Sequence, residues 1–228
     1  MNMIPNNIHL IFLREDEPFP ELFSMCLRRI KNMHSSWNVQ LYNERNAQEI
    51  LKQHLPQYVE AYNSFQHNVQ KADFLRVALV FIYGGFYMDL DMQVLKSLDD
   101  LRSHQLVLGE EKTVGEAEQQ ALNLKNRLRI ANYMFGGIAG HPFWILLMER
   151  MAILSTHSIN TQQELLDITG PGLTTDLYHE YADSYPDITL LRNTTRECLQ
   201  PNHHEISCHF GDYAAHLHAG TWRPEIGV

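Results

Sequence analysis

The sequence predicts an α/β domain, and three observations lead to this class. A chain of 228 residues, 44% of them hydrophobic, is long enough to bury one sizeable core. Its first third alternates short apolar runs with segments whose apolar residues recur at helical spacing. Residues 69–83 then form an almost entirely apolar helix, which Gly84 and Gly85 end before a further strand. This alternation is typical of the opening of a nucleotide-binding α/β layer.

Each predicted element has its own signal. Residues 8–13 are a short apolar run, and Trp37, Val39 and Leu41 alternate as in a half-buried strand. Apolar residues at helical spacing predict a helix over 19–33. Further helices are expected at 46–54, 58–65, 143–154 and 173–182, and further strands at 86–91, 106–109, 130–139 and 188–191. Residues 112–128 are polar and helix-prone, which predicts either a flap or an exposed helix.

The composition excludes several classes of protein. A net charge of −9 without a Lys/Arg block argues against nucleic acid as a partner, because a phosphate backbone binds basic surfaces. Cys26, Cys198 and Cys208 lie far apart without CxxC spacing, which favours a reducing compartment. The N-terminal apolar run is short and broken by His9, and no segment reaches transmembrane length. We therefore expect no integral membrane segment and a soluble protein that is cytoplasmic where it is made.

The apolar helix carries two charged residues, Asp73 and Arg76. They lie three residues apart and therefore share one face of the helix. Burying them costs several kcal/mol unless they are paired or bind a polar group. Two interpretations stay open: a buried ion pair that fixes the helix, or a polar contact to a ligand.

The strand after the double glycine carries Tyr87, Asp89 and Asp91. In an extended segment alternate residues share a face, so these three side chains are expected to point the same way. A divalent cation would relieve the repulsion between the two carboxylates, and oxygen ligands suit Mg²⁺ or Mn²⁺ with a nucleotide diphosphate completing the shell. An aspartyl-phosphate phosphatase also has Asp-x-Asp after a strand, but Gln93 stands where that motif has Thr or Val.

These residues together resemble a known family. Lys71–Arg76, followed after a short interval by Gly84–Asp91, closely resembles the sugar-binding region of the DXD glycosyltransferases. That group includes the fungal initiating α-1,6-mannosyltransferases and is related to the glucosyltransferase domain of the large clostridial toxins. Other matching segments follow in order along nearly the whole chain: 4–12, 132–136 with 140–143, 169–171 and 216–222.

The resemblance implies a fold and a domain arrangement. It implies a GT-A type single domain over 1–228, with a Rossmann-like mixed sheet, flanking helices and a donor bound at the carboxyl ends of the strands. The donor-binding core would cover about 1–111 and 130–140. The remaining residues would supply the acceptor side and the C-terminal closing segments.

The resemblance also implies roles for individual residues. Asp91 would hold the metal directly, while Asp89 would contact the donor sugar and ribose and meet the metal through water. Asp73 and Arg76 would hydrogen-bond the transferred sugar, with Asn132 near the reacting sugar. The residues that would contact the nucleotide are His9 and Phe12 of the first strand, Tyr87, Thr221 and Trp222, the last two closing over the diphosphate. Phe12 replaces the usual Trp, and Thr221 the usual Ser.

The histidine-rich C-terminal part allows three interpretations. A zinc site is one, although the Cys and His spacing matches no known pattern. In the transferase interpretation a histidine completes the metal shell. His216 and His218 share a face if 216–218 is extended, and the family resemblance favours His216. In the third interpretation both histidines only hydrogen-bond a closing loop.

The expected activity is metal-dependent hexose transfer with retention of configuration. The donor would be a UDP-sugar or GDP-sugar, the cofactor Mn²⁺ or Mg²⁺, and the acceptor a glycan or a protein. The resemblance makes Asp73 and Asp89 sugar-holding residues and not the acid and base of a glycosidase. Two alternatives stay open: an exported, toxin-like effector glucosyltransferase that acts on a host protein, and a sugar-nucleotide-binding module without turnover.

Overall fold

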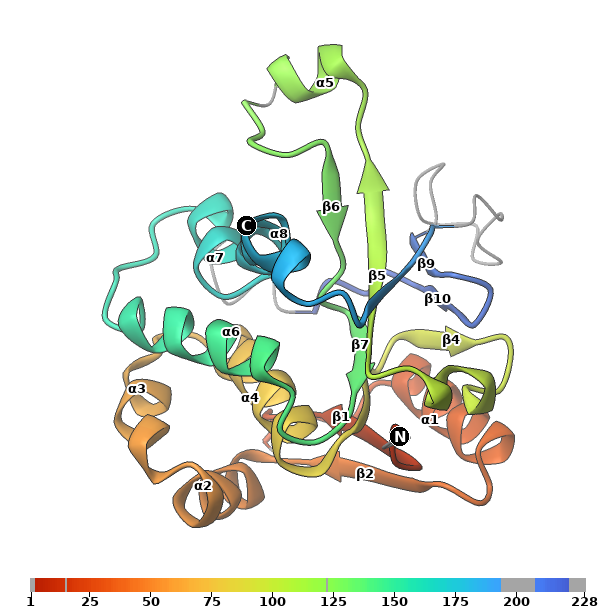
Figure 1. Cartoon of the computed structure of the whole chain (residues 1–228). Coiled ribbons are helices and arrows are strands. Elements are labelled where there is room, and N and C mark those ends of the chain that lie inside the picture. Colours follow the sequence, from red (N-terminus) through yellow and green to blue (C-terminus); the bar gives the residue numbers. More distant parts are fainter. Residues whose placement is uncertain (1–2, 15, 122, 194–207, 222–228) are drawn as a thin grey trace.

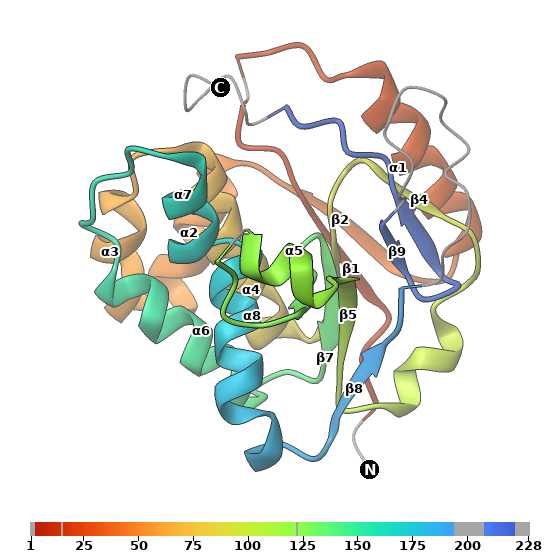
Figure 2. The same cartoon turned by 90° about the horizontal axis from the view of Figure 1, so that it is seen from above.

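The computed structural model describes residues 3–14, 16–121, 123–193 and 208–221. They form an α/β domain around a mixed sheet (Figures 1 and 2). The main path of the sheet runs β2 (Asn38–Tyr42), β1 (Asn7–Ile11), β3 (Gly85–Met88), β7 (Met134–Gly137), β5 (Leu106–Thr113) and β6 (Leu128–Ile130), and β8 (Ile188–Leu191) pairs with β5. The predicted fold class, a single α/β domain with a mixed sheet, is confirmed.

The first three strands of the path are parallel, and of the strands beyond them β7 and β6 run in the opposite direction. β1 pairs in parallel with both β2 and β3, whereas β7 runs antiparallel to β3 and to β5. β1 and β3 are buried over nearly their whole length, as their apolar sequences predict. Their carboxyl ends lie at one edge of the sheet, where ligands bind in open α/β sheets.

Helices cover the sheet. They are α1 (Glu21–Met33), α2 (Glu44–His54), α3 (Val59–Ser64), α4 (Asn68–Tyr83), α5 (Glu116–Ala121), α6 (Pro142–Ile153), α7 (Gln162–Ile168) and α8 (Pro171–Tyr181), with 3-10 turns at Pro56–Tyr58, Asp99–Ser103 and Ala182–Ser184. None of the helices in the described ranges is both long and apolar enough to cross a membrane.

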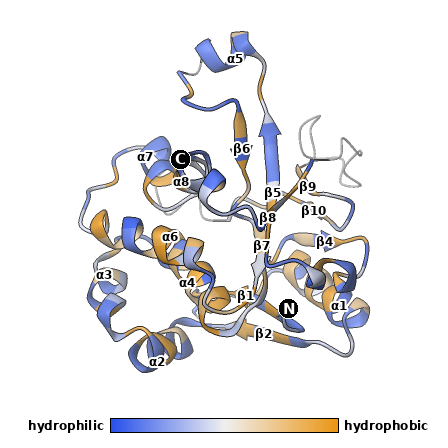
Figure 3. Cartoon of the chain, viewed as in Figure 1, coloured by the Kyte–Doolittle hydropathy of each residue, from blue (hydrophilic) through white to orange (hydrophobic). Residues whose placement is uncertain are grey.

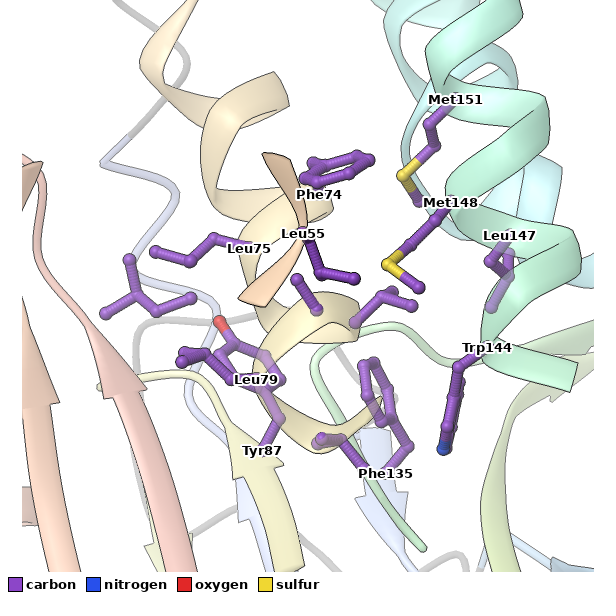
Figure 4. Packing of buried hydrophobic residues seen from close by; sticks show 14 of the residues in the cluster. Leu55, Phe74, Leu75, Leu79, Tyr87, Phe135, Trp144, Leu147, Met148 and Met151 are labelled. Carbon is purple, nitrogen blue, oxygen red and sulfur yellow. The ribbon is translucent and has the colours of Figure 1, made fainter. Parts of the chain in front are cut away.

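Helix α4 is the central helix of the fold. It packs against β1 and β3 on one side and α6 on the other, which explains its almost entirely apolar sequence. Figure 4 shows Phe74 and Leu79 of α4 near Met148 and Trp144 of α6, with Phe135 of β7 completing the cluster. Figure 3 shows the contrast between this apolar centre and the polar outer helices.

The double glycine allows α4 to turn directly into β3. Gly84 and Gly85 have φ angles of 63° and 109°, a region that side chains with a Cβ rarely adopt. A Cβ on Gly85 would lie 2.5 Å from the carbonyl oxygen of Asn7 on β1. Glycine is therefore needed both for the turn and for the close approach of the two parallel strands.

A second, three-stranded antiparallel sheet lies beside the first. Its order is β4 (Met92–Val94), β10 (Ala214–His216) and β9 (Cys208–Phe210), and α1 packs against β4. The sequence did not predict strands in this C-terminal part. The pairing of β10 with β4 brings residues 214–216 beside the residues that follow β3.

Several predicted boundaries were wrong. The strand expected over 130–139 is two strands, β6 and β7, separated by 131–133. The strand expected over 106–109 continues to Thr113 as β5. The flap or exposed helix predicted over 112–128 is present as a projecting arm, with α5 at its tip and β6 returning (Figure 1). Helix α7 was not predicted, because it is short and polar.

His9 links β1 to the double-glycine turn. Its ring is buried, with Nε2 2.9 Å from the carbonyl oxygen of Gly84 and Nδ1 3.0 Å from the hydroxyl of Tyr42. A carbonyl can only accept, so Nε2 donates its proton and Nδ1 accepts from Tyr42. The imidazole is therefore neutral. Burial lowers the pKa of His9 from 6.5 to about 4, against the opposing effect of the bond to Gly84.

This link predicts a pH dependence of stability. Below pH 6.5 the unfolded chain binds a proton at His9 that the folded protein, with its pKa of about 4, does not. The free energy of unfolding should therefore fall as the pH drops from 6.5 to 4, by about 3 kcal/mol from this residue. Urea unfolding at several pH values should show a flatter decline for His9→Gln, because the amide can donate to the Gly84 carbonyl without titrating. An equal decline in the two proteins would contradict this account.

Candidate active site

A cavity of about 310 Å³ opens at the carboxyl ends of β1 and β3. Its walls come from α4, from the end of β3, from the segment before β7 and from residues 216–221. The structure thus brings together side chains from four separated parts of the sequence. The predicted site residues that line the cavity are Phe12, Asp73, Arg76, Tyr87, Asp89, Asp91, Asn132, His216, His218 and Thr221.

Asp73 and Arg76 form one wall of the cavity. Arg76 Nη2 lies 3.0 Å from Asp73 Oδ1, and Arg76 Nη1 donates to the carbonyl oxygen of Asn132 at 2.7 Å. Asp73 Oδ1 also accepts from the amide of Asn132 at 3.1 Å, and Oδ2 accepts from the hydroxyl of Thr169 at 2.9 Å. The pair is both a buried ion pair and part of the cavity wall, so both interpretations of these residues apply.

Burial and neighbouring charges shift the pKa values of Asp73 and Arg76. Burial raises the pKa of Asp73 to about 6, although Arg76 and the hydroxyl of Thr169 oppose the shift. Burial alone would lower the pKa of Arg76, but Tyr87 and the carboxylates of Asp73 and Asp89 more than offset this and raise it. The guanidinium therefore remains charged and places a fixed positive charge in the cavity wall.

Tyr87 lies beneath this wall and connects it to Asp89. The guanidinium of Arg76 lies 4.7 Å from the centre of the Tyr87 ring, within the range of a cation–π contact. The Tyr87 hydroxyl donates to Asp89, whose carboxylate also lies 3.7 Å from Arg76 Nη2. Tyr87 is almost fully buried, so its main contacts hold Arg76 and Asp89 in position.

The two carboxylates of the Asp-x-Asp motif meet for a different reason than predicted. The strand expected over 86–91 ends at Met88, and residues 89–91 form a turn closed by a bond from Met92 N–H to the carbonyl of Asp89. The expected alternation therefore does not extend to Asp91. The turn, and not a pleated strand, directs Asp89 and Asp91 towards the same cavity.

Asp89, Asp91 and His216 form a group that could hold a metal ion. Each offers one ligand atom, and these atoms all lie within 4.8 Å of one another. His216 Nε2 lies 3.2 Å from Asp91 Oδ1 and 3.8 Å from Asp89 Oδ2. The His216 ring also stacks on Tyr133, with ring centres 4.6 Å apart. β10 thus places its last residue directly beside the Asp-x-Asp turn.

Asp91 also binds the backbone of the segment that follows β10. Its Oδ2 accepts from Ala219 N–H at 2.7 Å, and its carbonyl oxygen accepts from Leu217 N–H at 3.0 Å. Burial raises the pKa of Asp91, but His216 and the Ala219 amide outweigh it and lower the pKa to about 2. Burial raises the pKa of Asp89, despite the opposing charge of Arg76. The two carboxylates are therefore electrostatically different.

The structure distinguishes His216 from His218. The extended backbone ends at His216, and His218 has a positive φ of 52°, so the premise that 216–218 is extended was wrong. Both rings still line the cavity and lie 4.2 Å apart, but only His216 belongs to the group with the two carboxylates in the described chain. Thr221 lines the cavity, and Trp222 lies outside the described residues.

Phe12, which directly follows β1, lines the cavity, but His9 of β1 does not. Phe12 lines the cavity and packs edge-to-face on Phe19 and Phe23, with ring centres 5.0 and 6.4 Å away. His9 was predicted to contact the nucleotide, but it is absent from the cavity lining and bonds to Tyr42 and Gly84 instead. The reason is the pleat: His9 points towards α4 and the glycine turn, while the cavity begins beyond the strand's end.

Sequence reasoning did not assign site roles to four residues that line or support the cavity. Thr169 holds Asp73, and Tyr133 stacks on His216. Glu111 and Arg129 line the cavity and pair at 3.2 Å across β5 and β6. Residues 169–171 were matched to the family, but Thr169 was given no role. No spacing in the sequence could reveal the other three, because their positions depend on which strands pair.

Comparison with known proteins agrees with this geometry. Residues 20–108 match the model of the family described as glycosyltransferase sugar-binding region containing DXD motif. The chain is 28% identical to an uncharacterized glycosyltransferase, L373, of Acanthamoeba polyphaga mimivirus, over 98% of this chain and 86% of that protein. It is 21% identical to the mannosyl phosphorylinositol ceramide synthase SUR1 of Saccharomyces cerevisiae, over 90% of this chain but only 48% of that protein.

The fold is also found in a solved structure. The UDP-bound glycosyltransferase domain from the YGT toxin superposes with a TM-score of 0.55 at 10% identity, over 83% of this chain and 80% of that chain. At this identity the likeness concerns the fold alone, and it agrees with the predicted GT-A type. Fold, site and sequence relatives together identify the chain as a glycosyltransferase. Its similarity is to the DXD-containing glycosyltransferases, over residues 20–108 for the family model.

The bond from Thr169 to Asp73 predicts a measurable loss of stability. Thr169→Val removes the hydroxyl but keeps the shape, so a buried carboxylate oxygen loses its donor. The free energy of unfolding should fall by about 1.5–3 kcal/mol, as for hydrogen bonds to charged groups. Thr174→Val is the matched control, because this buried hydroxyl makes only a 3.4 Å contact to the Gly170 carbonyl. Denaturant unfolding that gives equal losses for both variants would show that the bond contributes nothing.

Proposed function

We propose that this glycosyltransferase is metal-dependent and moves a hexose, with retention of configuration, from a nucleoside diphosphate sugar to a glycan or protein acceptor. The observation that carries the proposal is the convergence of Asp89, Asp91 and His216 in a cavity that the Asp73–Arg76 pair also lines. A metal site and a sugar-binding wall in one cavity are what such a transfer requires.

The chemistry of the three ligands fits a divalent cation. Two carboxylates and one imidazole suit Mn²⁺, and the carboxylates alone also suit Mg²⁺. Ligand atoms on opposite sides of a Mg²⁺ ion lie about 4.2 Å apart. His216 Nε2 already lies within that distance of Asp89 Oδ2 and Asp91 Oδ1, so the triad needs little rearrangement. A bound ion would supply Lewis-acid stabilisation of the charge that develops on the leaving diphosphate.

The protein's own groups would position the donor. Arg76 directs a permanent positive charge into the cavity wall, and its bonds to Asp73 and to the Asn132 carbonyl hold it there. Asp73 and Asp89 present carboxylate oxygens that can accept from sugar hydroxyls. The hydroxyl of Thr221 is a donor at the end where the C-terminal segment passes the cavity.

The opposite end of the cavity suits a nucleobase. Phe12 and Phe23 line it, and the aromatic contacts of Phe12 with Phe19 and Phe23 keep that ring in place. Stacking on an aromatic face accepts any base, because each base has a π-face. This end therefore supports a nucleotide donor without selecting between UDP and GDP.

We infer retention of configuration from the family resemblance. The contacts that hold the carboxylates of Asp73 and Asp89 agree with this inference. Asp73 is held by Arg76, Asn132 and Thr169, and Asp89 by Tyr87, so both are better placed to bind the sugar than to attack it. A glycosidase would instead need one carboxylate as acid and another as nucleophile or base, without a metal.

The relatives suggest which donor and acceptor to test first. The yeast relative is named for adding mannose to a phosphorylinositol ceramide, a glycan-like head group on a lipid. Mannose is therefore the first sugar to examine, and a polyol or glycan the first acceptor class. A protein acceptor, as for a toxin-like effector, has support only from a likeness of fold.

A donor panel tests the proposal. The purified protein is incubated with UDP-glucose, UDP-galactose and GDP-mannose, with Mn²⁺, with Mg²⁺ or with EDTA, and the release of nucleoside diphosphate is measured. We expect hydrolysis of at least one donor with Mn²⁺ and none with EDTA. Binding of a donor without any release, with and without acceptor, would favour a module without turnover. Release that is unaffected by EDTA would contradict the metal dependence.

Asp91→Asn should abolish this activity while the fold remains intact. The amide keeps the size of the side chain but removes the negative charge that would hold the metal. We expect a loss of at least about 100-fold in kcat, the scale of losing a key electrostatic group. Asp183→Asn, on the exposed turn after α8, is the control and should keep full activity. Retained activity in Asp91→Asn would refute its metal role.

A further inference from the structure

Helix α1 borders a second hollow, outside the cavity described above. The helix buries Phe23, Cys26 and Ile30 against the core, as its amphipathic sequence predicts. Its outer side borders a hollow of about 730 Å³, whose floor includes Leu217 of the segment after β10. Nothing in the proposed transfer reaction uses this hollow.

The charged residues on this side of α1 are all basic beyond its first turn. Arg28 and Arg29 line the hollow, and Lys31 is exposed next to them. In the described chain no carboxylate lies within ion-pair distance of any of the three, and Arg29 is held by one bond from Nε to the carbonyl of Val94. The local field favours an anionic partner.

The rest of the lining is apolar and adaptable. Leu22, Met25, Met33 and Leu217 line the hollow, and Met25 is 50% exposed, among the most exposed large apolar residues of the described chain. Methionine side chains are unbranched and adjust to irregular apolar partners. Apolar residues edged by Arg and Lys on one side of a helix are the signature of a helix that lies in a membrane interface.

We propose that α1 is a peripheral docking site for an anionic lipid surface. Met25 and its apolar neighbours would enter the boundary between head groups and acyl chains, while Arg28, Arg29 and Lys31 would bind lipid phosphates and carboxylates. A soluble acidic protein would match the charges but would leave the apolar hollow unexplained. A neutral apolar ligand would leave the three cations unexplained. The proposal is independent of the proposed transfer reaction, so either can fail alone.

The position of the hollow gives this docking a consequence for the cavity. Leu217 lines the hollow, whereas the residues on either side of it, His216 and His218, line the cavity. Leu217 N–H also donates to the carbonyl of Asp91. A lipid bound at α1 would contact the back of the segment that closes the cavity.

Vesicle co-sedimentation tests the proposal. The intact protein is mixed, in EDTA, with vesicles of phosphatidylcholine alone or with added phosphatidylserine; EDTA prevents bridging by metal ions. We expect binding only with phosphatidylserine, and weaker binding at higher salt. Arg28→Glu with Lys31→Glu should reduce the partition coefficient by roughly 30-fold or more, at about tenfold or less for each basic residue removed. Arg29 is left in place because it bonds to Val94.

Matched controls separate a docking site from a general effect of charge. Lys52→Glu with Arg150→Glu makes the same change of net charge on exposed residues of α2 and α6 and should leave binding unaltered. Met25→Ala should weaken binding, whereas Ile153→Ala, at a residue 71% exposed on α6, should not. Thermal unfolding of each variant checks that it is folded.

Four results would overturn the proposal, the last two for the same reason. The first is no binding of the wild-type protein to phosphatidylserine vesicles. The second is equal losses from the two charge-reversal pairs, which would show that only net charge matters. The third and fourth are full displacement by soluble glycerophosphoserine and no effect of Met25→Ala, either of which would make the hollow an anion site without membrane insertion.

Discussion

The buried guanidinium of Arg76 is the interaction on which the cavity depends. Moving such a charge out of water costs several kcal/mol unless its partners are well placed. Here the partners come from three parts of the chain: Asp73 on α4, the carbonyl of Asn132 before β7, and Asp89 with Tyr87 at the end of β3. Because one cation needs all of them, the positions of these segments are coupled. The same groups then face the cavity.

A second constraint acts at the Asp-x-Asp turn. Asp91 binds the segment after β10 through Leu217 N–H, Ala219 N–H and His216. The contacts from His216 and Ala219 N–H stabilise a carboxylate that burial alone would disfavour, and together with the Leu217 bond they fix residues 216–219 beside the cavity. One residue thus both completes the candidate metal group and holds the segment that closes it. The site therefore depends on the small second sheet, because β10 of that sheet carries His216, which lies beside Asp91.

Much of the fold could be predicted, because long apolar segments leave few alternatives. The apolar helix α4, the double glycine after it and the strand Ile188–Leu191 lie where the sequence places them. Helix α7 was missed, although Thr161 and Glu164 form a capping box that could have indicated its start. Apolar periodicity is weak in such short polar helices, so capping is the better signal.

The site was predictable in its residues but not in its geometry. Asp73, Arg76, Asp89 and Asp91 could be selected because charges in apolar surroundings need a reason. That Asp89 and Asp91 lie on a turn could not be foreseen, since a short apolar run does not show where a strand ends. The family match pointed to His9 without regard to the pleat that turns its ring away from the cavity. Tyr133, Glu111 and Arg129 depend on strand pairing.

The central claim is that α4, the Asp-x-Asp turn and β10 build one metal and nucleotide site. Pulsed electron paramagnetic resonance of Mn²⁺ bound with UDP or GDP tests it most directly, because the spectrum reports imidazole nitrogen and nucleotide phosphorus near the ion. We expect coupling to both nuclei, with the nitrogen coupling lost in His216→Ala and kept in His218→Ala. Nitrogen coupling that persists in His216→Ala, or phosphorus coupling without any nitrogen, would contradict the claim.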